Sequence, residues 1–140
     1  MRIRKLIAAT AVAGGVLTAG LVTAAPASAA PASIDYDCAT GEVCLYYNSE
    51  AYGYGAVYVQ YDKIPNYQYR YFSSGRNGGS GAGVEVKNHA AAVDSWISST
   101  FRVYYNSNYN CNVACQNIPG YYTLDLNSKL KNNNASGQNI

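Results

Sequence analysis

Histidine and charge are scarce in this sequence, which has one histidine and only 13% charged residues. A single histidine leaves little for a zinc site or for a serine–histidine–aspartate catalytic set. Leucine-rich windows and alanine, glutamate and lysine-rich windows are absent after residue 35, which argues against long helices. Tyrosine, by contrast, occurs 15 times and, with valine, threonine and glycine, favours short strands and turns.

The first 29 residues predict a secretory signal peptide. Met1–Lys5 is basic, Leu6–Ala25 is a run of apolar and small residues, and Ala27–Ala29 has the A-x-A pattern of a signal-peptidase site. A membrane anchor is the alternative, but the run is mostly alanine, glycine and threonine and a cleavage site follows it. We therefore expect cleavage after Ala29 or Ala30 and a secreted, extracellular protein.

Cleavage changes the charge of the chain. The full sequence has a formal net charge of +2, and Arg2, Arg4 and Lys5 leave with the signal, so the remainder is near −1. No basic patch remains that would favour nucleic acid or an anionic membrane surface. The sequence predicts one monomeric domain of modest core size, because a chain of roughly 110 residues supports a single core.

The four cysteines fit an oxidising compartment. They form two close pairs in the sequence, Cys38 with Cys44 and Cys111 with Cys115. Three connectivities are possible, and the two local pairs are favoured because each closes a tight turn without long-range geometry. A zinc site is disfavoured, since the spacings do not match those of zinc ligands.

The rest of the chain predicts an all-β domain over residues 38–136, between a flexible segment at 30–37 and a frayed tail at 137–140. The stretch HAAAVDSW within Lys87–Ser99 is predicted to make a helical turn. Short strands are predicted at Val43–Tyr47, Ala56–Tyr61, Tyr67–Phe72, Val84–Val86, Phe101–Tyr105 and Tyr121–Leu126.

An internal repeat indicates how these strands are arranged. Leu45–Ser49 matches Val103–Ser107, and the stretch Val86–Ala92 matches Leu130–Ser136 in the same order along the chain. Two ordered matches indicate a duplicated four-strand unit with a longer middle in its first copy. Two such units packed face to face would bury alternating tyrosine, valine and leucine in a sandwich.

These features resemble the streptomycete metalloproteinase inhibitor family. The residues that carry the resemblance are the opening Cys38-x2-Gly41-x2-Cys44-Leu45, the two YYNS turns, the two Lys-Asn strand ends and the cysteine loop after the second YYNS. The resemblance covers about residues 38–136 and implies a βγ-crystallin-like sandwich of two Greek-key motifs. It also implies a peptidase inhibitor, not an enzyme, that needs no cofactor of its own.

The resemblance places the inhibitory segment in the loop Cys111, Asn112, Val113, Ala114 and Cys115. In the family, the inhibitory bond joins the first cysteine to an apolar residue, whereas Asn112 occupies that second position here. Either the bond shifts to Asn112–Val113, or the protein does not inhibit a thermolysin-like metalloprotease, the extracellular partner that the family implies. A disulfide-closed loop is already ordered, so its binding costs less conformational entropy. Tyr109 and Ile118 are candidates for flanking contacts.

Five alternatives remain open from the sequence. The cysteine loop is equally compatible with a plain stabilising turn. A secreted binding or antimicrobial module would use exposed tyrosines, and a third possibility is a wall-associated stability protein. The βγ-crystallin resemblance also raises a calcium site, but the matching segments Asn88–Ala92 and Asn132–Ser136 offer few oxygen ligands. His89 with Asp94 or Asp125 and Ser95 is the weak catalytic candidate.

Overall fold

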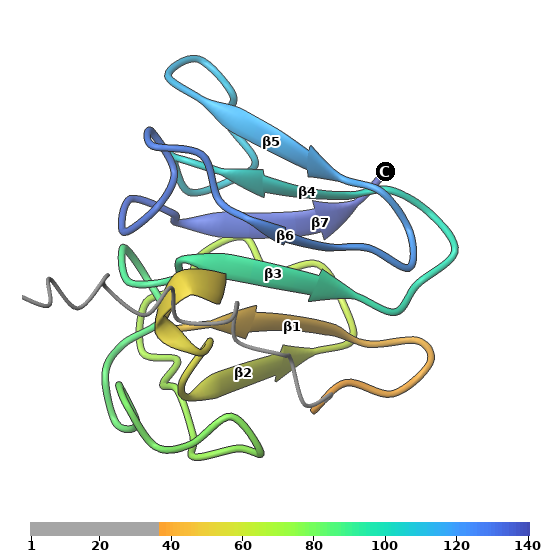
Figure 1. The fold of residues 1–140 in the computed structure, drawn as a ribbon. Coiled ribbons are helices and arrows are strands. Elements are labelled where there is room, and N and C mark those ends of the chain that lie inside the picture. Colours follow the sequence, from red (N-terminus) through yellow and green to blue (C-terminus); the bar gives the residue numbers. More distant parts are fainter. Residues whose placement is uncertain (1–36) are drawn as a thin grey trace, which may run out of the picture.

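The computed structural model describes residues 37–140, so the predicted signal peptide and nearly all of the 30–37 segment lie outside the described residues. Seven short strands and one 3-10 turn make up the regular structure (Figure 1). They are β1 Val43–Tyr46, η1 Glu50–Tyr52, β2 Val57–Gln60, β3 Ala92–Ser95, β4 Phe101–Tyr104, β5 Cys115–Ile118, β6 Thr123–Asp125 and β7 Ser136–Asn139. Within this part of the chain, no helix is long and apolar enough to cross a membrane.

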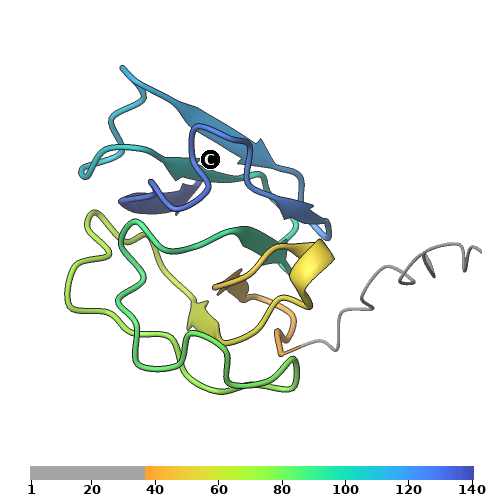
Figure 2. The ribbon, with the colours of Figure 1, turned by 60° about the vertical axis from the view of Figure 1, so that its left-hand side comes forward.

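The strands form two antiparallel sheets, which confirms the all-β prediction. The first sheet has the order β2-β1-β3-β6 and the second the order β5-β4-β7. Figures 1 and 2 show the two sheets stacked as layers of a sandwich. Strands β1 and β3 are buried along their whole length, because they lie inside the larger sheet with neighbours on both edges.

The two halves of the chain exchange one segment each. Strand β6 comes from the second half but pairs with β3 of the first sheet, so that Val93 lies opposite Leu124. In return, Ile64 of the first half bridges Gly137 of β7 in the second sheet. The two halves are therefore interlocked, and neither sheet is complete without both of them.

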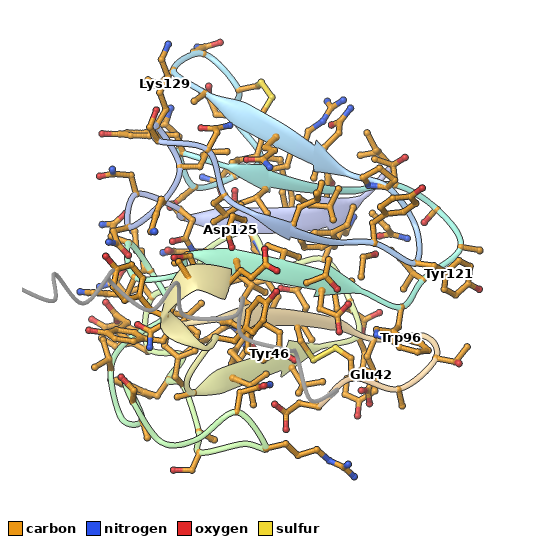
Figure 3. All side chains as sticks on the ribbon, in the orientation of Figure 1. Glu42, Tyr46, Trp96, Tyr121, Asp125 and Lys129 are labelled. Carbon is orange, nitrogen blue, oxygen red and sulfur yellow. A yellow bond between two sulfur atoms is a disulfide. The ribbon has the colours of Figure 1, made fainter. Side chains whose placement is uncertain are left out.

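The space between the sheets holds the main core. Val43, Leu45 and Val93 from the first sheet belong to one buried cluster with Phe101 and Val103 from the second. Burial of such side chains stabilises the fold by roughly 1.5–3 kcal/mol each relative to leaving them exposed. A second cluster covers the outer face of the first sheet. Figure 3 shows Tyr46, one of its members, on the face that also carries η1.

The repeat is visible in the hydrogen bonds as well as in the sequence. Asn88 and Asn132, equivalent in the two copies, both have left-handed backbone angles, with φ of 64° and 60°. The Asn88 N–H donates to the Asn134 carbonyl, and the Asn132 N–H donates to the Ala90 carbonyl, at 2.7 and 3.0 Å. The duplicated segments thus bind each other across an approximate twofold relation.

Three predicted elements are wrong. Residues Ala92–Ser95, within the predicted helical turn, form the central strand β3, because pairing with β1 and β6 outweighs the helical propensity of the alanines. Tyr67–Phe72 makes a turn in place of a strand, since Arg70 N–H bonds the Tyr67 carbonyl and Tyr69 is left-handed. Val84–Val86 contributes only one isolated bridge, between Tyr71 and Glu85.

The predicted frayed tail is also wrong, because Ser136–Asn139 forms strand β7 beside β4. Its composition is poor for a strand, and its place is explained by packing. A Cβ atom at Gly137 would overlap Tyr67 and Phe101, so that only glycine allows this close approach. Strand β5 is also absent from the predicted strands, although Cys115–Ile118 pairs with β4 in full register.

Candidate functional site

The candidate inhibitory loop is the connection between β4 and β5. Its counterpart in the first copy is the connection between β1 and β2, and the two connections have the same length and closing geometry. Tyr104 pairs with Cys115 as Tyr46 pairs with Val57. The Tyr105 N–H donates to the Ala114 carbonyl at 3.0 Å, as Tyr47 N–H does to Ala56. Both connections are therefore long hairpin loops on the same frame.

The first arm of the β4–β5 connection is fixed to the rest of the domain. Asn108 N–H donates to the Pro65 carbonyl at 2.7 Å, and Tyr109 N–H donates to Ser136 Oγ at 3.2 Å. The Ser136 hydroxyl in turn donates to the Asn106 carbonyl at 2.7 Å. The Tyr109 ring packs edge-on against Tyr104. The base of the loop is thus held by contacts from two other segments.

The tip of the connection projects into solvent. The residues from Asn110 to Val113 are all exposed, and Val113 has 55% of its surface accessible. The disulfide between Cys111 and Cys115 closes the tip, with Cα atoms 5.2 Å apart. The Asn110 side chain accepts a hydrogen bond from the Asn112 N–H at 2.8 Å. An exposed apolar side chain therefore sits on a loop that is ordered from both sides.

The first hairpin is covered where the second is not. Gly55, at the position equivalent to Val113, lies so close to the 73–83 loop that a Cβ atom would come within 2.7 Å of the Ser80 carbonyl oxygen. The Ala56 N–H also donates to that oxygen, at 2.9 Å. The shorter chain between β5 and β7 leaves Val113 without such a cover. The longer middle of the first copy explains this difference in exposure.

The structure brings together Cys111, Asn112, Val113, Ala114 and Cys115, and both disulfides join the local pairs that the sequence favours. The expected flanking contact of Ile118 is wrong, because this residue is fully buried in the main core. Tyr109 keeps part of its surface accessible at the base of the loop. The exposure of the tip was not foreseeable from the sequence, since it depends on the 73–83 loop.

Among the described residues, no hydrogen bond joins His89, Asp94, Asp125 or Ser95 to another member of this catalytic candidate set. His89 Nδ1 lies 2.8 Å from the Lys87 carbonyl. The Asp94 carboxylate accepts hydrogen bonds from Thr123 Oγ1 at 2.7 Å and from Trp96 Nε1 at 2.9 Å. Its burial raises the pKa of Asp94 above the usual range. Asp94 is thus the polar centre of a structural network on the outer face of the first sheet.

Among the described residues, one group has metal-ligand spacing. Cys38, Glu42 and Cys44 place their donor atoms within 4.8 Å of one another. Both sulfurs of this group belong to the Cys38–Cys44 disulfide, so thiolate ligation is not available to a metal. The two segments weighed as a calcium site, Asn88–Ala92 and Asn132–Ser136, meet elsewhere, beside Lys131, which brings a positive charge to a place where calcium would need carboxylates.

The interlocked sheets and the two repeated hairpins define a two-motif βγ-crystallin fold. A comparison of structures agrees: the chain is similar to a solved structure described as "Evolution of the eye lens beta-gamma-crystallin domain fold", with a TM-score of 0.52 and 12% identity. The similarity covers 76% of this chain and 91% of that one. No protein-family model matches the sequence, and no curated protein does either. The predicted βγ-crystallin-like fold is thereby confirmed.

Proposed function

We propose that the protein is a secreted peptidase inhibitor that presents the Cys111–Cys115 loop to an extracellular thermolysin-like metalloprotease. The observation that carries the proposal is Val113, an exposed apolar side chain at the tip of a disulfide-closed loop. Such a protease binds a peptide segment and accommodates an apolar side chain in a pocket beside its metal. The metal belongs to the target, and the inhibitor contributes only shape and the side chain.

The anchored base of the loop explains how inhibition would be achieved without turnover. A loop that is ordered before binding loses little conformational entropy on docking. If the target cuts the Cys111–Asn112 or the Asn112–Val113 bond, the disulfide still holds the two ends together. The bonds from Asn108 and Tyr109 to the domain also keep the first arm in place. Resynthesis of the bond then competes with release of the ends.

The test is inhibition of a thermolysin-like enzyme by the full chain, purified with both disulfides verified by mass. We expect Val113→Asp to weaken inhibition by at least a hundredfold, because a charge in an apolar pocket costs roughly 3 kcal/mol or more. Ile140→Asp is the matched control, since Ile140 is 51% exposed at the chain end. Inhibition that survives Val113→Asp, or that is absent from the parent, would reduce the loop to a stabilising turn.

A binding module without inhibitory activity is the second candidate. Six tyrosines leave more than half of their surface accessible, and exposed tyrosines, with an apolar ring and a polar hydroxyl, are common in binding surfaces. They are Tyr52, Tyr61, Tyr69, Tyr71, Tyr121 and Tyr122. They come from separate segments, and Figure 3 places Tyr121 at the end of the molecule away from η1. This second candidate would be supported only if alanine replacements of neighbouring tyrosines each abolished binding of the same ligand.

A further inference from the structure

A groove of about 470 Å³ opens where the two copies of the repeat meet. Its walls come from the β1–β2 connection, from the segment before β3 and from the segment before β7. These three segments gather at the left of Figure 1, and Figure 2 turns that end toward the viewer. The groove shares no residue with the Cys111–Cys115 loop.

The groove lining includes two aromatic rings and a fixed cation. Tyr47 and Tyr52 line the groove, and Tyr52 is 76% exposed. The Lys131 ammonium donates to Ser49 Oγ at 2.8 Å and lies 5.8 Å from the centroid of the Tyr52 ring. These two contacts hold the cation in the groove before any ligand arrives, which lowers the entropic cost of using it.

The groove lining also offers amides and an imidazole. Asn88 and Asn132 are exposed, and their side-chain amides make no hydrogen bond with another described residue. Each amide therefore has donors and an acceptor available for a ligand. His89 lines the groove next to Asn88, and its Nδ1 contact with the Lys87 carbonyl fixes the ring orientation. The tautomer with Nδ1 protonated leaves Nε2 as an acceptor.

The repeat retains the residues that build this groove. Of its nine lining residues, seven are identical to their counterparts in the other copy, and the exceptions are Tyr52 and His89. The two copies differ widely elsewhere, including at the hairpin tips. Asn110 and Asn133 replace the two exceptions in the other copy, so the aromatic and imidazole groups belong to this groove alone. The exceptions give this groove its own chemistry.

The lining selects the class of ligand. The described residues of the groove include no carboxylate and one lysine, so they favour an anion over a cation. Tyrosine rings pack against the apolar faces of sugar rings, and amides match hydroxyl groups. We propose that this groove binds an acidic saccharide, with Tyr47 and Tyr52 packing on a pyranose ring and Lys131 pairing with its carboxylate. This function is separate from protease inhibition.

The test is calorimetric titration of the full chain with a galacturonate pentasaccharide and a glucuronate pentasaccharide. The methyl ester of each has the same sugars without the charge. We expect at least one acid to bind and its ester to bind at least tenfold more weakly, since a charge-assisted pair is lost. Equal binding of acid and ester, or no binding of either acid up to ~10 mM, would overturn the proposal.

Variants locate the site. Lys131→Gln should weaken binding of the acid at least tenfold, and Lys131→Arg should restore part of that binding. Lys87 is the repeat counterpart of Lys131 and lies outside the groove, so Lys87→Gln should bind the acid as the parent does. Tyr52→Phe should retain binding and Tyr52→Ala should lose it. Unchanged binding in Lys131→Gln would refute the site. Val113→Asp should leave saccharide binding intact, which keeps this test independent of the inhibitor proposal.

Discussion

Replacing the buried Asn134 tests whether the two halves depend on each other. Its side chain is fully buried and spans them: Oδ1 accepts the Ala90 N–H at 3.0 Å, and Nδ2 donates to the Val86 carbonyl at 3.2 Å. In Asn134→Ala, the Val86 carbonyl keeps a second donor, the His89 N–H at 3.1 Å. The Ala90 N–H keeps none among the hydrogen bonds of the described residues.

The magnitude follows from that difference. One buried unsatisfied N–H costs about 1–3 kcal/mol, and the small cavity left by the amide adds about 1 kcal/mol. We therefore expect Asn134→Ala to lower the free energy of unfolding by about 2–4 kcal/mol. For a domain of this size, that loss lowers the midpoint of urea unfolding by about 1–2 M.

The assay is urea unfolding followed by the fluorescence of Trp96, the single tryptophan of the chain. Figure 3 shows Trp96 at the end of the molecule away from η1, so its signal reports on the whole domain and not on the substituted site. Asn133→Ala is the control, because Asn133 is half-buried and its amide bonds only the Lys131 carbonyl. A loss below about 0.5 kcal/mol in Asn134→Ala would refute the reasoning.

Two further predictions concern packing and pH. Gly137→Ala should destabilise the domain by about 1–3 kcal/mol, because the new Cβ atom would overlap Tyr67 and Phe101. The control Gly41→Ala places its Cβ atom in open space and should cost only the strain of a positive φ. Similar thermal midpoints for the two variants would contradict this packing. Burial raises the pKa of Asp94, so the folded protein holds the proton of this carboxyl more tightly than the unfolded chain does. The contribution of Asp94 to stability therefore falls as the pH rises from the unfolded-state pKa through the folded-state pKa. Urea titrations at several pH values should show this loss in the parent but not in Asp94→Asn, and parallel pH profiles would count against it.

The sequence predicts the fold where the repeat and the side-chain pattern agree. Val43 and Leu45 alternate as strand residues, and Leu45 matches Val103 in the other copy, so β1 and β4 follow directly. Strands β3 and β7 escape prediction because their position depends on distant partners. Ala92 and Gly137 have weak strand propensity. Ala92 is part of a strand because it pairs with Tyr46 and Asp125, and Gly137 pairs with Val103 at a place where a Cβ atom would overlap its neighbours.

The candidate site is predictable to a similar degree. The cysteine spacing identifies the loop, and Val113 is its one branched apolar residue. Exposure of Val113 and burial of Ile118 depend on which segments cover each hairpin, and no local pattern contains that information. The groove is hidden for the same reason, since Tyr52 and Lys131 meet only after the two copies interlock.

Comparison of the two hairpins suggests where function lies in a duplicated domain. Both have the same length, closing bond and register, so the frame constrains them equally. They differ at the tip, where Gly53 of the covered hairpin corresponds to Cys111 of the exposed one. The covered tip also has Gly55 where the exposed tip has Val113, and only glycine at that position lets the 73–83 loop approach so closely. The exposed tip is closed covalently by the Cys111–Cys115 disulfide, which keeps it ordered. The disulfide thus does for the second hairpin what the 73–83 loop does for the first, and it leaves Val113 open to a partner.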